Sequence, residues 1–182
     1  MKYLVDVVNL NSDASCLSSS RWLEILRGEE NSYLYNWLNL YANSGKKVVL
    51  GLTGACIADM VRFNPETVSL INSRPDIFEL VLRPFSHDIS LLRSKEGFLK
   101  NYMLGKASVE KEFNNVSNYF LPPEFMLTNE QIKILSGCGV EGTFINPSRF
   151  KKEVEKRIPK YPYFINGLFN SKLKCISFTG NL

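Results

Sequence analysis

The sequence predicts an α/β fold, a (β/α)7-type incomplete barrel of parallel strands. Two observations lead to this prediction. Seven short segments rich in Val, Ile, Leu and Phe are spread along the 182 residues, and segments with helical spacing lie between them. Apolar residues at successive positions are typical of strands buried on both faces, and strand–helix–strand alternation is typical of a parallel sheet covered by helices. An open, doubly wound sheet is the alternative that the same pattern allows.

The predicted strands are short, and no linker separates them. No Pro-, Gly- or Ser-rich stretch, internal repeat or low-complexity segment divides the chain, so we expect a single domain over residues 1–182. The seven strands are predicted at residues 3–10, 47–52, 78–83, 119–121, 142–145, 163–168 and 173–178.

Five helical segments are predicted between the strands. In the first, apolar residues from Trp22 to Tyr41 recur at three- and four-residue steps, and Glu29–Asn31 can break this helix in two. Thr128 and Gln131 form the pattern of a capping box, which predicts the start of another helix. The remaining helices are expected over 55–71, with a disturbance at Pro65, over 90–115 and over 148–157.

The charge and cysteine content exclude several classes of protein. The 22 basic and 18 acidic residues give a net charge of +4 that is spread along the chain, so we expect no nucleic-acid partner and no membrane surface. No apolar run is long enough for a membrane span or a signal peptide. The four cysteines, Cys16, Cys56, Cys138 and Cys175, contain no CxxC pair, so we expect no zinc ribbon and a cytoplasmic protein. Cys56, Cys138 and Cys175 stand among apolar residues and are expected in the core.

Polar side chains follow the predicted strands at the points where ligands bind in such folds. The carboxyl ends of parallel strands meet at one edge, and a rim of directional donors and acceptors there suits a polyhydroxylated ligand. These residues are Asn9, Asn11 and Asp13 after the first strand, Thr53 after the second, Glu79, Arg83, His87 and Asp88 in and after the third, Glu124 after the fourth, Asn146 after the fifth, and Asn166 or Asn170 after the sixth.

Glu124 has a setting that distinguishes it from the other polar residues. Pro122 and Pro123 precede it and Phe125 and Met126 follow it, so its carboxylate is expected on a stiff turn among apolar groups. A retaining glycoside hydrolase needs such a carboxylate as its nucleophile, with a second carboxyl group about 5–5.5 Å away. A helix cap or a solvated side chain is the alternative interpretation of Glu124.

His87 is the only histidine, and several roles remain open for it. It could contact a sugar, act as a base, bind a metal or pack in the core; a metal would need Asp6, Asp13 or Asp88 as partners, and we expect no metal. Asp88 could also cap the helix that follows. The sequence has no phosphate-binding loop and no serine in a nucleophile elbow.

Residues 119–144, YFLPPEFMLTNEQIKILSGCGVEGTF, resemble the nucleophile region of glycoside hydrolase family 57. In that family a glutamate ends the fourth strand after a short turn containing Leu and Pro, and a helix with an early acidic residue follows. Upstream, FELV at 78–81 and FSHDISLL at 85–92 resemble the family's strand with a glutamate and its Tyr-x-His-Pro-Ile-Leu-x-Leu block. The resemblance covers residues 75–150, and the two blocks occur in the family's order.

The resemblance implies a barrel that acts on the glycosidic bonds of an oligosaccharide or polysaccharide without a cofactor, as the α-amylases, amylopullulanases and glucanotransferases of the family do. Glu124 falls on the family's nucleophile, and Glu130 falls on the acidic residue of the helix start. The residues expected to contact substrate are Glu79, Arg83, His87, Asp88, Asn9, Asn11 and Asn146.

The sequence departs from the family at two motifs. Asn9 and Asn11 stand where the family has His-Gln-Pro, and the family's catalytic Asp has no counterpart before Leu182. The chain is therefore either the N-terminal part of a longer protein or a domain that lacks this acid. If the second carboxylate comes from this chain, Asp6, Asp13 or Asp88 has to supply it.

Two alternatives follow from these departures. Polysaccharide deacetylases have a similar barrel, and Asp6 and His87 resemble part of their metal site, but Pro84 or Phe85 stands where the first His of their two-His motif belongs. The other alternative is a non-catalytic sugar-binding or interaction module on the same scaffold, which the missing motif and the missing acid favour.

Overall fold

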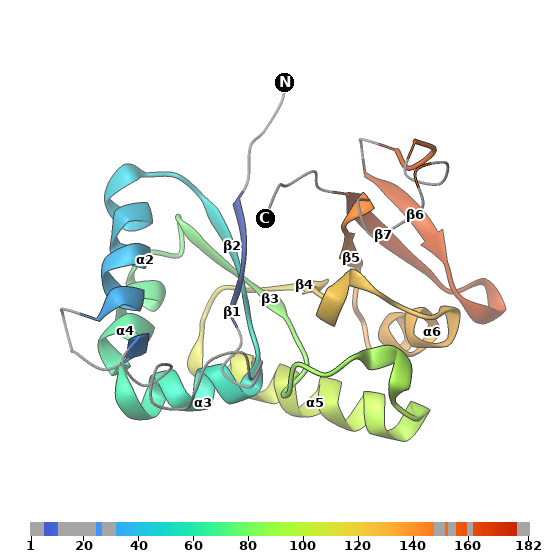
Figure 1. The fold of residues 1–182 in the computed structure, drawn as a ribbon, viewed down its shortest axis with the longest axis horizontal. Helices are drawn as coiled ribbons and strands as arrows, with labels where there is room; N and C mark the ends of the chain where they lie inside the picture. The colour runs from blue at the N-terminus through green and yellow to red at the C-terminus, as the bar shows by residue number, and fades with distance from the viewer. Residues whose placement is uncertain are drawn as a thin grey trace. The chain divides into compact units, whose positions relative to one another are not determined.

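The computed structural model describes residues 6–10, 25–26, 32–147, 152, 156–159 and 162–177 (Figure 1). Helices and strands alternate along most of this length, and η2, η3 and η5 are single 3-10 turns. The elements are β1 (Asp6–Leu10), α2 (Tyr33–Ser44), β2 (Val48–Leu52), α3 (Gly54–Phe63), α4 (Pro65–Ser73), β3 (Phe78–Leu82), η2 (Ser90–Leu92), α5 (Lys95–Glu112), β4 (Val116–Phe120), η3 (Pro123–Phe125), α6 (Asn129–Gly137), β5 (Gly142–Ile145), β6 (Tyr163–Asn166), η5 (Leu168–Asn170) and β7 (Lys172–Ser177).

The sheet has the strand order β1-β2-β3-β4-β5-β7-β6. The pairs β1–β2, β2–β3, β4–β5 and β5–β7 are parallel, with Val8 opposite Leu50 and Thr143 opposite Cys175 as examples of the register. The prediction of an α/β fold with a mostly parallel sheet is therefore confirmed. The chain forms two compact units, residues 1–87 with 101–117 and residues 88–100 with 118–182. A single domain over residues 1–182 stays a prediction.

Strand β6 is the exception to the parallel arrangement, because it pairs antiparallel with β7. Only residues 167–171 connect the two strands, and a parallel connection would need a crossover of a dozen residues or more. Phe169 and Asn170 adopt positive φ angles of 55° and 62° in this connection. Such angles at two successive residues match the right-handed twist of a tight hairpin.

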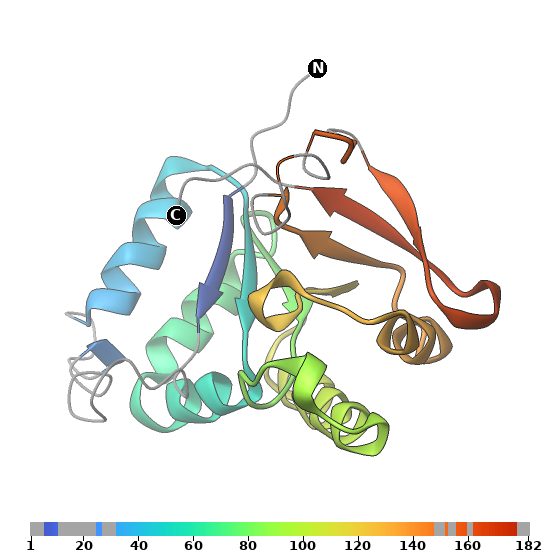
Figure 2. The same ribbon diagram turned by 45° about the vertical axis from the view of Figure 1, so that its right-hand side comes forward.

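In the first unit, helices α2 and α4 pack together beside strands β1–β3 (Figures 1 and 2). The helix predicted over 55–71 is interrupted where Pro65 stands. Asn64 ends α3 and caps α4, and its side-chain amide also donates to the Leu26 carbonyl oxygen at 2.7 Å and to Ser32 Oγ at 2.6 Å. The fully buried core side chains of this unit include Leu38, Leu50, Ile57, Met60 and Leu80.

In the second unit, α6 begins at the capping box that the sequence predicts. Thr128 Oγ1 accepts from the Gln131 amide at 3.1 Å, and Gln131 Oε1 accepts from the Thr128 amide at 3.0 Å. Phe98 and Phe120 meet edge to face with ring centroids 6.2 Å apart, and Leu135 and Leu173 are fully buried.

The cysteines that the structure describes are core or half-buried thiols. Cys56 and Cys175 are buried, Cys138 is half-buried and none of the three is in a disulfide, whereas Cys16 lies outside the described residues. In the described part of the chain, no helix has both the length and the apolar character that a membrane crossing requires.

Candidate functional site

The segment that follows β3, residues 83–87, is fixed by two helices of the first unit. At the start of α3, the Gly54 amide donates a hydrogen bond to the Pro84 carbonyl oxygen at 3.2 Å. On α5, the Asn101 carbonyl oxygen accepts from the Phe85 amide at 2.9 Å. The strand end is therefore anchored through its backbone on both helices.

Helix α5 approaches this segment so closely that Gly105 has no space for a side chain. A Cβ atom at Gly105 would lie 2.0 Å from the Arg83 carbonyl oxygen. One turn earlier, Asn101 Oδ1 accepts from the Ser86 amide at 2.9 Å, and Asn101 Nδ2 donates to the Ser86 carbonyl oxygen at 3.1 Å. Hydrogen bonds to residues 84–86 consequently fix the backbone between Arg83 and His87.

The Arg83 and His87 side chains, both predicted to contact substrate, form a hydrogen bond. Arg83 is fully buried, and its Nη2 lies 2.7 Å from His87 Nδ1. A guanidinium group can only donate, so Nδ1 must offer its lone pair. A neutral imidazole with Nδ1 as acceptor carries its hydrogen on Nε2. Arg83 therefore selects the His87 tautomer whose Nε2–H is a hydrogen-bond donor.

This arrangement does not fit a metal centre of the deacetylase kind. A metal needs a nitrogen lone pair from His87, but Nδ1 accepts from the guanidinium and Nε2 carries the hydrogen. Asp88 forms an ion pair with Arg93, while the Asp6 side chain and Asp13 are outside the described part of the chain. Among the described residues, no three His, Cys, Asp or Glu side chains are grouped as metal ligands.

The other candidate site residues described in the first unit lie in β3, in β1 and at the start of α3. Glu79 is exposed on β3, opposite Val49 in the register and within the strand. Asn9 lies in β1 opposite Gly51, and Asn11 falls outside the described residues. Thr53 is buried and caps α3, since its Oγ1 accepts from the Cys56 amide at 3.2 Å.

Glu124 lies in a tight turn after β4, in the second unit. Glu124 and Phe125 both have left-handed backbone angles, with φ of 50° and 56°. The Phe125 amide donates to the Pro122 carbonyl oxygen at 3.1 Å, and the Met126 amide donates to that of Pro123 at 3.2 Å. Left-handed angles are unfavourable for residues with a side chain, so the hydrogen-bonded turn imposes them. Glu124 as a whole residue is half-buried on this turn.

Asn146 belongs to the same edge as Glu124, because the two residues follow neighbouring parallel strands. Thr143 Oγ1 on β5 donates to the Phe120 carbonyl oxygen at the end of β4, at 2.9 Å. Asn146 follows β5 directly and only 4% of its surface is exposed. Glu124 and Asn146 thus follow the carboxyl ends of the neighbouring strands β4 and β5.

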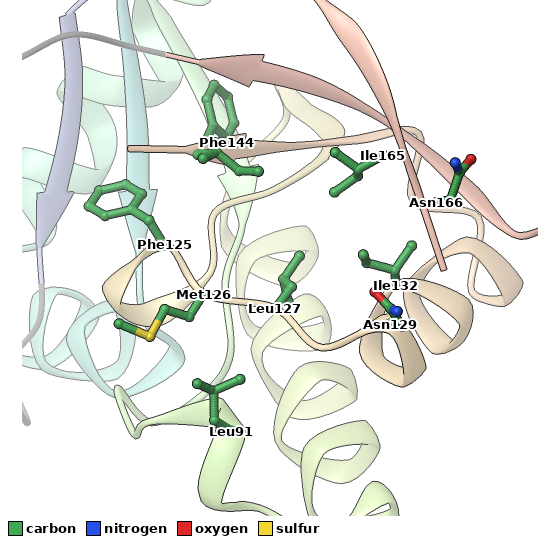
Figure 3. A pocket seen from close by; sticks show the side chains of 10 residues that line it. Leu91, Phe125, Met126, Leu127, Asn129, Ile132, Phe144, Ile165 and Asn166 are labelled. Carbon is green, nitrogen blue, oxygen red and sulfur yellow. The ribbon is translucent and has the colours of Figure 1, made fainter. Parts of the chain in front are cut away.

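A pocket of about 370 Å³ lies beside the Glu124 turn, within the second unit (Figure 3). From the sequence, Phe125 and Met126 are recognisable only as apolar neighbours of Glu124, and the pocket is not predicted. Three successive apolar residues, 125–127, in a loop were the available signal. The pocket is lined by Leu91, Phe125, Met126, Leu127, Asn129, Ile132, Phe144, Ile145, Ile165 and Asn166.

The fold has counterparts among solved structures. No protein-family model and no curated protein sequence matches the chain. A 4-alpha-glucanotransferase from Thermococcus litoralis is similar with a TM-score of 0.74 and 14% identity, over 96% of this chain and 27% of that protein. A protein assigned as a polysaccharide deacetylase from Mycobacterium smegmatis has a TM-score of 0.65 and 10% identity, over 97% of this chain and 59% of its own.

A third similar structure is described as a pseudoenzyme. It is a CE4 family protein from Bacillus anthracis, with a TM-score of 0.54 and 15% identity, over 97% of this chain and 54% of that protein. The chain thus spans about a quarter of the glucanotransferase and less than two thirds of the other two. At these identities the similarity establishes the fold, which is that of barrel-like glucanotransferases and deacetylases.

Proposed function

We propose that this chain is a carbohydrate-active domain that transfers or hydrolyses glycosyl groups, with Glu124 as its nucleophile. The observation that carries the proposal is the left-handed turn that holds the half-buried residue Glu124 shortly after β4 ends. Strained backbone at a strand end is a recurring feature of active sites. The resemblance of residues 119–144 to family 57 and the fold shared with a 4-alpha-glucanotransferase support the same function.

In the proposed reaction, a Glu124 carboxylate oxygen attacks the anomeric carbon of the sugar. A bond forms between that oxygen and carbon, and the bond from the anomeric carbon to the leaving oxygen breaks, with its electron pair going to the leaving group. Water or a second sugar then displaces Glu124 and restores the carboxylate. A separate acid group protonates the leaving oxygen, and its conjugate base then takes the proton of the incoming water or sugar hydroxyl.

The tautomer of His87 fits a sugar oxygen better than a metal. The Nε2–H of His87 is a donor for a hydroxyl or ring oxygen, whereas a metal ligand would need a lone pair there. Asn146 supplies an amide at the Glu124 edge. Arg83 is proposed as a positioning residue for His87, and Glu79, Asp88, Asn9 and Asn11 remain substrate-binding candidates.

The nucleophile is best tested with a substrate that needs no acid. In 5-fluoro-α-D-glucosyl fluoride the leaving group departs as fluoride, so the attack by Glu124 can be observed without a proton donor. We expect the intact mass of the 182-residue chain to increase by one fluoroglucosyl group, with the label on Glu124. Glu124→Gln should not be labelled. Glu130→Gln, an exposed carboxylate of α6 only six positions away, should be labelled like the unmodified chain.

Two results would contradict the proposal. Labelling of Glu124→Gln would show that another group is the nucleophile. If the unmodified chain binds maltooligosaccharides but is never labelled, the chain is a non-catalytic sugar-binding module, the alternative that Asn9 and Asn11 in place of His-Gln-Pro favours. Zn²⁺-dependent release of acetate from an acetylated oligosaccharide would instead establish the deacetylase reaction.

A further inference from the structure

The pocket beside the Glu124 turn differs chemically from the polar strand ends. Its walls consist of aliphatic side chains, Met126 and two phenylalanines, and no charged side chain lines it. Its two polar side chains are the amides of Asn129 and Asn166, and both residues are exposed to solvent. Figure 3 shows these two amides on one side of the pocket and Phe125 with Phe144 on the other. The pocket is thus lined mostly by apolar surface, and its hydrogen-bonding side chains are neutral amides.

A sugar without an apolar substituent is a poor ligand for such a pocket. A pyranose carries several hydroxyl groups, and each hydroxyl that leaves water without a partner weakens binding. Two side-chain amides cannot serve all of them. An apolar group, by contrast, loses unfavourable contact with water on entering, and a single polar junction at the rim can reach Asn129 and Asn166.

The walls of the pocket are formed before any ligand arrives. At the end of β6, a Cβ atom on Gly167 would lie 2.7 Å from Ile132 Cγ2 and 2.8 Å from the Asn129 carbonyl oxygen, so the hairpin is seated directly on α6. On the other side, the left-handed turn fixes Phe125. A pocket that needs little rearrangement retains most of its binding free energy for the ligand.

We infer that this pocket binds the apolar aglycone of a glycoside, with the first sugar at its rim beside Asn129 and Asn166. The sugar part of this inference rests on the proposed function, and the apolar part rests on the pocket alone. The ligand class is an alkyl glycoside without charge. Because Phe125 lines the pocket and follows Glu124 in the chain, an occupied pocket keeps the ligand beside the candidate nucleophile.

The inference can be tested with methyl, propyl and hexyl glucoside below their micelle-forming concentrations. Binding is followed by NMR of protein labelled at the Ile, Leu and Met methyl groups. Each additional methylene that enters the pocket should strengthen binding roughly fourfold. The shifts should concentrate on Met126, Leu127, Ile132 and Ile165 and spare the exposed Leu40.

Two substitutions at neighbouring positions of β6 distinguish binding in the pocket from binding at the protein surface. Ile165 faces the pocket, whereas its neighbour Phe164 is 68% exposed. Ile165→Trp should fill the pocket and weaken hexyl glucoside binding at least tenfold, while Phe164→Ala should leave it unchanged. If Ile165→Trp does not fold, the chain-length series on the unmodified protein still decides.

An affinity that does not change from methyl to hexyl glucoside would overturn the inference, as would equal shifts at Leu40. The series should persist in Glu124→Gln, because the pocket does not contain that carboxylate. If the glycosyl fluoride does not label the unmodified protein but the chain-length series is intact, the proposed nucleophile is refuted and the pocket assignment stands.

Discussion

The guanidinium group of Arg83 is not accessible to solvent, and as a hydrogen-bond donor it determines which nitrogen of His87 carries the hydrogen. A buried charge is costly unless it is hydrogen-bonded, so the contact with His87 Nδ1 at 2.7 Å stabilises Arg83 and orients the imidazole at once. The sequence identified both residues as candidates because they follow an apolar strand. Their pairing depends on the backbone between them and could not be predicted from spacing.

The first prediction concerns the hydrogen on His87. Two-bond proton–nitrogen NMR should show the Nε2–H tautomer near neutral pH, because Nδ1 accepts from the guanidinium. Arg83→Met, which keeps an apolar chain of similar length but has no donor, should allow the Nδ1–H form to appear. An Nδ1–H tautomer in the unmodified protein would refute the positioning role of Arg83.

At the scale of elements, side-chain chemistry predicted some boundaries well. Thr128 with Gln131 and the disturbance at Pro65 mark real helix starts, because capping is decided by residues three positions apart. Strand β4 was predicted only from residue 119, whereas it begins at Val116. Its first residues are half-buried and Asn118 is exposed, so they lack the continuous apolar pattern of a buried strand.

The close approach of α5 to the end of β3 gives a second prediction. Gly105→Ala should lower the free energy of unfolding by about 1–3 kcal/mol, because the new methyl group meets backbone that cannot move aside. Gly137→Ala is the matched control, since nothing lies within 4 Å of the methyl group at that position in α6. Urea denaturation measures both. Equal stabilities of the two variants would show that the segment after β3 yields easily.

At the scale of the whole molecule, the α/β class and the mostly parallel sheet could be predicted because most apolar runs are continuous and segments with helical spacing lie between most of them. The antiparallel orientation of β6 could not be predicted, because the residues of an apolar strand do not indicate its direction in the sheet. Only the short connection to β7 determines that direction. The pocket could not be predicted either. Its walls come from Leu91, Phe144 and Ile165, residues that are far apart in sequence and ordinary in type.

We expect the stability of the folded protein to depend on pH at alkaline values. Burial raises the pKa of Tyr163 above its usual value of 10.0, and hydrogen bonding to Cys175 adds to this shift. Burial also raises the pKa of the Cys175 thiol above its usual 9.0. The folded protein therefore holds these protons more tightly than the unfolded chain. This stabilisation is complete below the usual thiol value and is lost as the pH rises through the raised pKa values.

Urea midpoints measured from neutral pH to about pH 10.5 should therefore fall at the alkaline end. Cys175→Ala should reduce this fall in the urea midpoint, because it removes the thiol, one of the two groups with a raised pKa. Cys138→Ala removes a half-buried thiol of the same kind as a control and should leave the decline unchanged. A flat profile in the unmodified protein would contradict the raised pKa values.

The left-handed turn at Glu124 has a consequence for engineering. A side chain in this conformation costs roughly 1–2 kcal/mol, and glycine avoids that cost while losing about 0.5–1 kcal/mol of chain entropy. Glu124→Gly should thus melt at or above the temperature of Glu124→Gln while lacking the carboxylate. Screening variants for heat resistance alone would then select against the residue that we propose as the nucleophile. Any effort to make this protein more robust has to assay glycosyl transfer alongside melting temperature.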